Sequence, residues 1–254
     1  MATSIIPKPG KPKSVGQFAI AYIDFLGTKD KINKDTESQY LNRLYGMYET
    51  ASNLCENIPF VKADIKVKVF SDNVILAVPV TKAHPEDDII SLIQFAALFQ
   101  SIAVVSHNWL VRGGITVGEL FLDKLMVWGK GLIRAYDLES RLAVFPRIIA
   151  DPIVFQEESQ GFSLFSSYFR IDEDGLYYVD FLNSTTYIKT DGTKDPLQEG
   201  VLKALAEIKK TDGTYDEKAY QKLQWYKNYI KQWYSEHYHK ESGQTADLLE
   251  DIVK

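Results

Sequence analysis

Two aspartates stand where a carboxylate could bind a metal ion. Asp24 closes the apolar run FAIAYIDFLG, and Asp72 lies in the turn of IKVKVFSDNVILAVP. A carboxylate at the end of a buried strand is unfavourable unless a partner compensates its charge. If the two strands are neighbours, the pair forms a site for a hard divalent cation, which prefers oxygen ligands and often also holds substrate phosphates. Such a site supports phosphoryl chemistry without a covalent intermediate.

The composition is that of a globular chain, with 45% hydrophobic and 25% charged residues among 254. This length can bury the core of one domain with an extension, or of two small domains. The net charge of −5 lacks the electrostatic footprint of a nucleic-acid binder, so we expect no nucleic-acid partner. The single Cys55 rules out an internal disulfide and fits a reducing cytoplasm, where we expect the protein to be located.

Two segments bear on whether the chain enters a membrane, and neither has the pattern of a membrane segment. Residues 1–16 are rich in Pro, Gly and Lys and lack the apolar core of a signal peptide, so we expect a flexible lead. The segment 89–110 is apolar, but Ser and Gln residues interrupt it repeatedly, which a single spanning helix rarely tolerates. We expect a long helix packed on a sheet, and no membrane.

Hydrophobic periodicity predicts strands and helices in the order β-α-β-β-α-β, which is typical of a ferredoxin-like α+β sheet. The hairpin is expected to turn at Ser71-Asp72-Asn73, because these residues favour turns. In chain order we expect a strand at 18–27, a helix at 38–58, the hairpin at 63–80, a helix at 87–108, a strand at 110–122, a helix after Gly131 and a strand at 146–155.

The pattern changes from about residue 163. A hairpin is predicted around Glu173-Asp174-Gly175, followed by helices at 200–210 and 219–242. The last helix carries Tyr and Trp at helical spacing, which predicts packing against the domain or a partner. We therefore divide the chain into the lead at 1–16, a domain at 17–160, and a C-terminal hairpin and helical extension at 161–254.

Four segments resemble, in order, the catalytic domain of the class III nucleotidyl cyclases: YIDFLG, KVFSDNVILAV, VRGGITVGEL and VWGKGLIRAYDLES. They correspond to the family's first metal-binding strand, its metal-binding hairpin, its Arg-x-Gly-Ile strand and its dimer-facing helix. The resemblance covers roughly residues 17–155. It implies that 17–160 is a ferredoxin-like βαββαβ cyclase catalytic domain.

The resemblance also implies a site. Asp24, Asp72 and the carbonyl of Phe25 would hold two Mg²⁺ or Mn²⁺ ions, which activate the ribose 3′-hydroxyl and stabilise the charge on the α-phosphate. Family members dimerise head to tail, and the partner chain completes each site on the nucleoside triphosphate. The implied nucleotide-binding groups are the backbone amides of Phe25, Leu26, Gly27 and Thr28, and the side chain of Lys68.

The sequence departs from the family where the base and the transition state are contacted. The family has an Asn and a transition-state Arg on the helix after the Trp-Gly turn, and this chain has Ile133 and Asp137 there. The position of an adenine-reading Asp is Met126. Arg134 and Arg141 could replace the missing Arg; alternatively, they form ion pairs with Asp137 along the helix.

Three other residues have a structural and a functional interpretation. Arg112 either pairs with a nearby carboxylate or binds phosphate. Lys68 alternates with Lys66, which favours a solvated face, although its place four residues before Asp72 also fits contact with a base or a phosphate. Trp128 is expected in the core rather than against a base.

The closest resemblance is to a divergent branch, the uridylate and cytidylate cyclases of the bacterial Pycsar antiphage system. It implies conversion of UTP, favoured over CTP, to the 3′,5′-cyclic monophosphate and pyrophosphate. The product would be a second messenger in antiphage defence, bound by a separate effector. One alternative is a non-catalytic cyclase-like domain that binds a nucleotide or a partner. A polymerase-like palm is disfavoured by the negative net charge.

Overall fold

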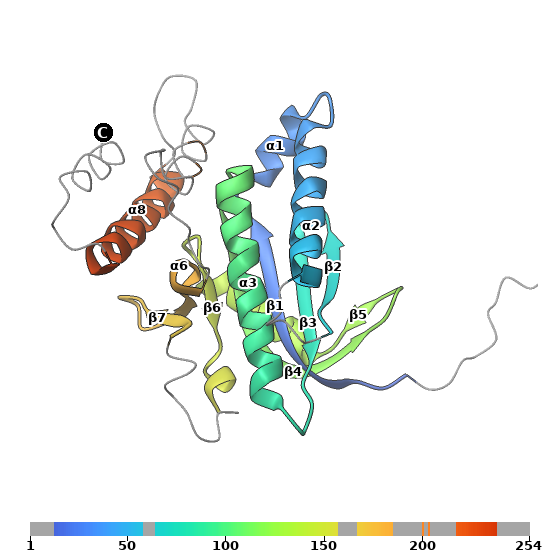
Figure 1. The fold of residues 1–254 in the computed structure, drawn as a ribbon. Coiled ribbons are helices and arrows are strands. Elements are labelled where there is room, and N and C mark those ends of the chain that lie inside the picture. Colours follow the sequence, from blue (N-terminus) through green and yellow to red (C-terminus); the bar gives the residue numbers. More distant parts are fainter. Residues whose placement is uncertain are drawn as a thin grey trace, which may run out of the picture.

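The computed structural model describes residues 13–57, 64–156, 167–184 and 217–237, together with positions 200 and 203. Its centre is a mixed sheet with the strand order β2-β3-β1-β4-β6-β8-β7, to which β5 is added by pairing with β4 (Figure 1). The strands are β1 (Gly16–Phe25), β2 (Lys66–Phe70), β3 (Asn73–Pro79), β4 (Val111–Leu122), β5 (Val127–Trp128), β6 (Ile148–Ala150), β7 (Phe169–Ile171) and β8 (Tyr177–Val179).

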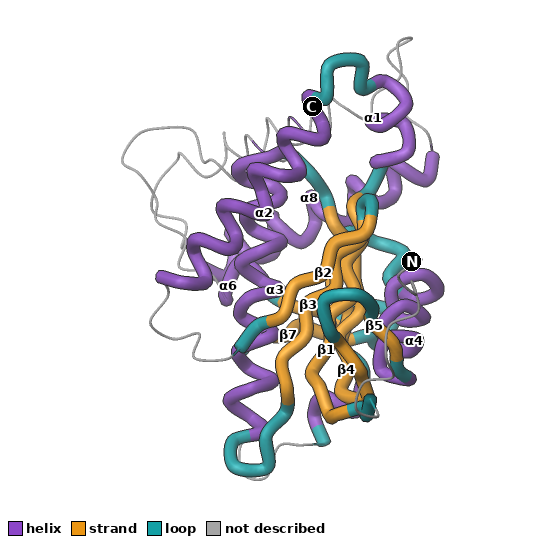
Figure 2. Tube along the Cα trace, turned by 90° about the vertical axis from the view of Figure 1, so that its right-hand side faces the viewer, coloured by secondary structure: helices purple, strands orange, loops and turns teal. Residues whose placement is uncertain are grey.

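Helices cover both faces of this sheet. Figure 2 shows α2 and α3 on one face and α4 on the other. The helices are α1 (Thr28–Lys34), α2 (Gln39–Asn57), α3 (Pro85–His107), α4 (Lys130–Asp137), α6 (Phe181–Ser184) and α8 (Glu217–His237). A π-helical turn, η1 (Leu138–Leu142), continues α4, and a 3₁₀ turn, η2 (Pro152–Phe155), follows β6.

The position of the central strand β1 explains why its sequence is almost entirely apolar. It pairs antiparallel with β3 on one edge and with β4 on the other. Ala19 and Ile23 pack in the large core that contains α3, and Ile20 packs in a smaller cluster with Ala135 of α4. Because both faces are covered, the strand is a nearly continuous apolar run, as predicted.

Helix α3 is the apolar segment that could be mistaken for a membrane span. By length and composition it could cross a membrane, but 72% of its most apolar window is buried inside the protein. Two of its polar side chains donate hydrogen bonds inside the protein: Ser91 Oγ donates to the carbonyl of Asp87 (2.7 Å), and Gln100 Nε2 donates to that of Pro146 (3.3 Å). It is a core helix, as the Ser and Gln interruptions predicted.

Helix α4 and turn η1 lie unusually close to β4. A Cβ atom at Gly114 would lie 2.4 Å from the Cβ of Leu138, and one at Gly131 would lie 2.4 Å from Cδ1 of Ile20. No side chain larger than a hydrogen fits at either position without moving backbone or core. The close packing places η1, which carries Glu139, directly over the start of β4.

Several local predictions were wrong or incomplete. The strand expected at 146–155 is only β6, because Pro152 begins η2. The helix expected after Gly131 changes to a π turn at Leu138, and the short elements α1, β5 and α6 were not predicted. The remaining predicted elements of the sheet and its helices are present, and the α+β class is confirmed.

The C-terminal part extends the same sheet. The predicted hairpin is β7–β8, and β8 pairs with β6 through Ile149 and Tyr178. Helix α8 buries the aromatic stripe against the domain, with Tyr226, Ile230 and Trp233 in the main core. Most of the helix predicted at 200–210 lies outside the described residues. The domain division at residue 160 stays a prediction.

Candidate functional site

Asp24 and Asp72 lie at the same end of neighbouring strands. In the β1–β3 register Asp24 is opposite Asn73, and the amide of Phe25 donates to the carbonyl of Asp72 (3.2 Å). Asp72 is held in a tight turn in which Ser71 has a φ of 56°. The negative charge of Asp72 contributes to a raised pKa of Asp24, after the larger effect of burial. The adjacency predicted from the sequence is therefore present.

Arg112 connects this pair to a third carboxylate. It is opposite Asp24 in the β1–β4 register, and its Nε donates to Asp24 Oδ2 at 3.2 Å. The same Nε lies 2.8 Å from Glu139 Oε1. Because Nε carries one hydrogen, it cannot point at both oxygens, and Glu139 Oε1 is buried without a hydrogen bond. Of the two interpretations of Arg112, the structure shows the ion pair.

Glu139 is the site residue that sequence reasoning missed. Its side chain is only 4% exposed, and burial, opposed by Arg112 and reinforced by the charges of Asp24 and Asp72, raises its pKa to about 7. Within the sequence it looks like an ordinary acidic residue between Asp137 and Arg141. The only available signal was the second glycine of VRGGI, Gly114, which lets η1 approach β4.

The site fits a divalent cation. Asp24 and Glu139 share one guanidinium and Asp72 lies near both, so the cluster has excess negative charge that a cation would relieve. Among the described residues no group of three or more His, Cys, Asp and Glu side chains has metal-site geometry. The predicted donors are instead two carboxylates and the carbonyl of Phe25. That carbonyl accepts from Thr28 Oγ1 (2.8 Å) and keeps a second lone pair.

The predicted amide cradle is only partly available. The amide of Phe25 is used by Asp72, and that of Leu26 donates to the carbonyl of Leu110 (2.9 Å). A triphosphate cradle would therefore be built by Gly27 and Thr28, where α1 begins. Gly27 has a φ of 77°, which favours glycine.

Arg134 and Arg141, the two candidates for the missing transition-state arginine, differ in their partners and in their exposure. Arg134 does not pair with Asp137 as expected; its Nε and a terminal nitrogen contact Asp151 Oδ2 and Oδ1 at 2.6 and 3.3 Å. Thr116 Oγ1 also donates to Asp151 (3.0 Å). Arg141 does lie beside Asp137 (3.2 Å), and its side chain is 76% exposed. Arg134 thus has a structural partner, whereas Arg141 is mostly in solvent.

The face predicted for Lys68 was wrong. On β2 the lysines are half-buried, whereas Val67 and Val69 are exposed, because β2 is the edge strand of the sheet. Lys68 Nζ donates to the carbonyl of Lys124 in the β4–β5 connection (3.1 Å). Its proposed contact with a base or a phosphate stays a prediction.

Trp128 is not in the core. It is 63% exposed because β5 pairs with only the last residues of β4 and extends outward. It belongs to a set of exposed large apolar residues at the end of β2, on the β4–β5 arm and on α4, which we call the apolar face: Phe70, Leu125, Met126, Trp128, Ile133 and Tyr136.

Glu139→Gln is predicted to change the pH dependence of stability. Because the pKa of Glu139 is about 7 in the folded state and 4.5 in the reference state, the wild type loses stability as pH rises from about 4.5 to 7. The variant, which has no proton to lose, should gain roughly 3–6 °C in Tm relative to the wild type over this range. Thermal unfolding with a chelator present measures this. A constant Tm difference would contradict the assigned pKa.

Comparison with known proteins shows the fold. No family model and no curated protein matches this chain. The guanylyl cyclase domain of the RhoGC fusion protein from the aquatic fungus Blastocladiella emersonii has a TM-score of 0.51 at 12% identity, over 66% of this chain and 98% of that one. The adenylyl cyclase CyaB from P. aeruginosa has a TM-score of 0.49 at 13% identity, over 72% and 98% of the two chains. On the similarity to the guanylyl cyclase domain, the chain has the fold of a class III cyclase catalytic domain.

Proposed function

We propose that this protein is a metal-dependent nucleotidyl cyclase, and that it converts UTP, or CTP, to the 3′,5′-cyclic monophosphate and pyrophosphate. The observation that carries the proposal is the pair Asp24 and Asp72, held at one end of β1 and β3 by the Phe25–Asp72 backbone hydrogen bond. The pair occurs in a fold shared with a guanylyl cyclase domain.

The residues of the site have distinct tasks in this proposal. Asp24, Asp72 and the carbonyl of Phe25 would hold two Mg²⁺ or Mn²⁺ ions. When bound, the ions supply activation of the ribose 3′-hydroxyl and charge stabilisation at the α-phosphate. Arg112, now paired with Asp24 and Glu139, would gain a third partner in the triphosphate once the metals neutralise the carboxylates.

The pyrimidine preference rests on the sequence resemblance. Where purine cyclases that read adenine have an Asp, this chain has Met126, whose thioether is a weak acceptor. UTP and CTP differ by a carbonyl and an amino group, which one or two polar side chains distinguish. The preference for UTP, the Pycsar role in antiphage defence, the separate effector and the cytoplasmic location are parts of the proposal.

A homodimer with composite sites is supported by the apolar face. It includes residues of VWGKGLIRAYDLES, the segment that the resemblance assigns to the dimer contact, and several of its members are more than half exposed: Phe70 79%, Leu125 93%, Trp128 63% and Ile133 63%. Apolar side chains gathered in this way are typical of an interaction surface. A head-to-tail partner seated here would bring its own arginine toward the metal site.

A second candidate function is a non-catalytic, cyclase-like binding domain. It is favoured by Ile133 and Asp137, which replace the Asn and Arg of the family, and by the contact that Arg141 makes with Asp137. This candidate predicts that a nucleotide stabilises the protein but is not converted.

Incubation with each of ATP, GTP, CTP and UTP and Mn²⁺ distinguishes the two candidates. We expect mass spectrometry to detect a cyclic pyrimidine nucleotide and pyrophosphate. Asp24→Asn and Asp72→Asn should each lower turnover at least about 100-fold, because either change removes a charged metal ligand. Asp87→Asn, in the exposed first turn of α3, is the matched control. No cyclic product from any nucleotide would favour the binding domain.

The missing transition-state arginine can be identified by separating turnover from stability. Arg141→Ala should lower turnover by about 10²–10³-fold with a small change in Tm, because the residue makes only an exposed ion pair. Arg134→Ala should lower stability by about 2 kcal/mol, because it leaves the carboxylate of Asp151, only 11% exposed, without its cation. If Arg141→Ala turns over normally, Arg141 is not the replacement.

Ile133→Lys should convert a dimer to a monomer, because it puts a charge in the centre of the apolar face. Sedimentation velocity measures the mass, and turnover should fall with it. Ile32→Lys is the control, since Ile32 has similar exposure (55% against 63%) but lies on α1. A wild-type protein that is monomeric at all concentrations tested would contradict the composite site.

A further inference from the structure

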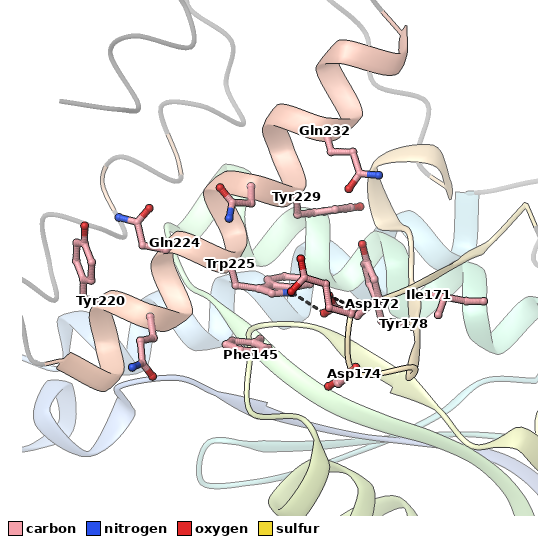
Figure 3. Close-up of a pocket in the computed structure, with 13 residues that line it drawn as sticks. Phe145, Ile171, Asp172, Asp174, Tyr178, Tyr220, Gln224, Trp225, Tyr229 and Gln232 are labelled. Carbon is pink, nitrogen blue, oxygen red and sulfur yellow. Dashed lines mark hydrogen bonds between the residues drawn. The ribbon is translucent and has the colours of Figure 1, made fainter.

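A pocket of about 920 Å³ lies between α8 and the β7–β8 hairpin (Figure 3). Along α8 it is lined by residues spaced at one side of the helix, from Tyr220 to Gln232. The opposite wall is formed by the hairpin tip, Asp172–Asp174, with Tyr178 and Phe145. Nothing in the proposed cyclase chemistry uses this pocket.

The stacked rings of Trp225, Phe145 and Tyr229, which we call the aromatic wall, are held rigidly. The Trp225 ring stacks on Phe145, with centroids 5.9 Å apart and planes 7° apart, and on Tyr229 at 5.6 Å. Trp225 Nε1 donates to Asp172 Oδ2 (2.6 Å), which fixes the ring against the hairpin. A wall held in this way is pre-organised, so that binding costs little side-chain entropy.

The side chains that line the pocket carry negative charge. Three acidic residues line the pocket, Asp172, Glu173 and Asp174, and none of the lining residues in the described part of the chain is Lys, Arg or His. Arg147, fully buried behind the wall, pairs with Asp172 and Asp174 and neutralises one of these charges. The pocket therefore repels phosphates and attracts a cationic group, for which Asp174, with its side chain 42% exposed, is accessible.

A row of carboxamides runs along the helix beside the aromatic wall. Gln221, Gln224 and Asn228 make no side-chain hydrogen bond within the described part of the chain, and Gln232 donates to Glu236 (3.0 Å). Each carboxamide can donate and accept at the same time, which suits the alternating N–H and C=O groups of a peptide backbone. Because the row covers about 16 Å of helix, an extended peptide of about five residues matches its length.

We propose that this pocket binds an extended segment of a partner protein that carries an Arg or a Lys side chain. The carboxamides of α8 would hold the peptide backbone, the aromatic wall would contact the aliphatic stem of the basic residue, and the hairpin tip would hold its charged end. The proposal does not rest on cyclase activity, because binding can be measured without nucleotide or metal.

An immobilised array of acetylated hexapeptides tests this proposal with the full-length protein. Each position is varied through all residue types in an alanine background. We expect retention to rise with Arg or Lys and to fall with Asp or Glu at one or two positions. Gln224→Lys, which puts a cation inside the pocket, should weaken binding at least tenfold. Ser235→Lys, an exposed position on α8 that does not line the pocket, adds the same charge and should change binding less than twofold.

Four results would overturn the proposal. The first two are no peptide retained above background and no preference for basic residues. The third is equal binding by the Gln224→Lys and Ser235→Lys proteins, and the fourth is full displacement of the peptide by N-acetyl-arginine amide at a concentration equal to that of the peptide. The third would mean non-specific attraction to an acidic protein. The fourth would mean a site for a small free cation. Unchanged circular dichroism spectra and Tm values of both variants verify that each is folded.

Discussion

The contact of Arg112 with Asp24 and Glu139 holds together the three parts of the chain that make the candidate site. Asp24 comes from β1, Arg112 from β4, and Glu139 from the π turn that follows α4. The contact exists only because η1 rests directly on β4, where Gly114 leaves no room for a Cβ. A larger residue at this position would move Glu139 away from the guanidinium and change the charge of the site.

The same contact leaves part of the negative charge of the carboxylates uncompensated. The single Nε–H of Arg112 can donate to only one of the two carboxylates, and the charge of Asp72 contributes to the raised pKa of both. A purely structural salt bridge would be balanced, with each oxygen hydrogen-bonded. An excess of negative charge at the end of two strands instead favours a divalent cation, through which the proposed triphosphate would be held. This imbalance, rather than the fold alone, connects the structure with phosphoryl chemistry.

Much of this arrangement could be predicted from the sequence, because strand periodicity and turn residues are local. The FAIAYIDFLG strand and the Ser-Asp-Asn turn gave the two aspartates and their adjacency. Glu139 could not be found in this way, since its burial depends on how closely η1 lies on β4. Arg134 was expected to pair along its helix, but Asp151, which follows β6, provides a bidentate partner that only the tertiary structure brings near. Trp128 and the face of Lys68 were misassigned because a periodic pattern does not show which strand is at the edge.

The central claim is that Asp24 and Asp72 together bind divalent metal. Crystals grown with Mn²⁺ and a non-hydrolysable pyrimidine triphosphate would test it, with anomalous diffraction recorded at the manganese edge. The account predicts anomalous peaks between the two carboxylates, within coordination distance of both and of the carbonyl of Phe25, and their loss in Asp72→Asn. A bound triphosphate with no manganese at these aspartates, or manganese held by Asp24 alone, would contradict it.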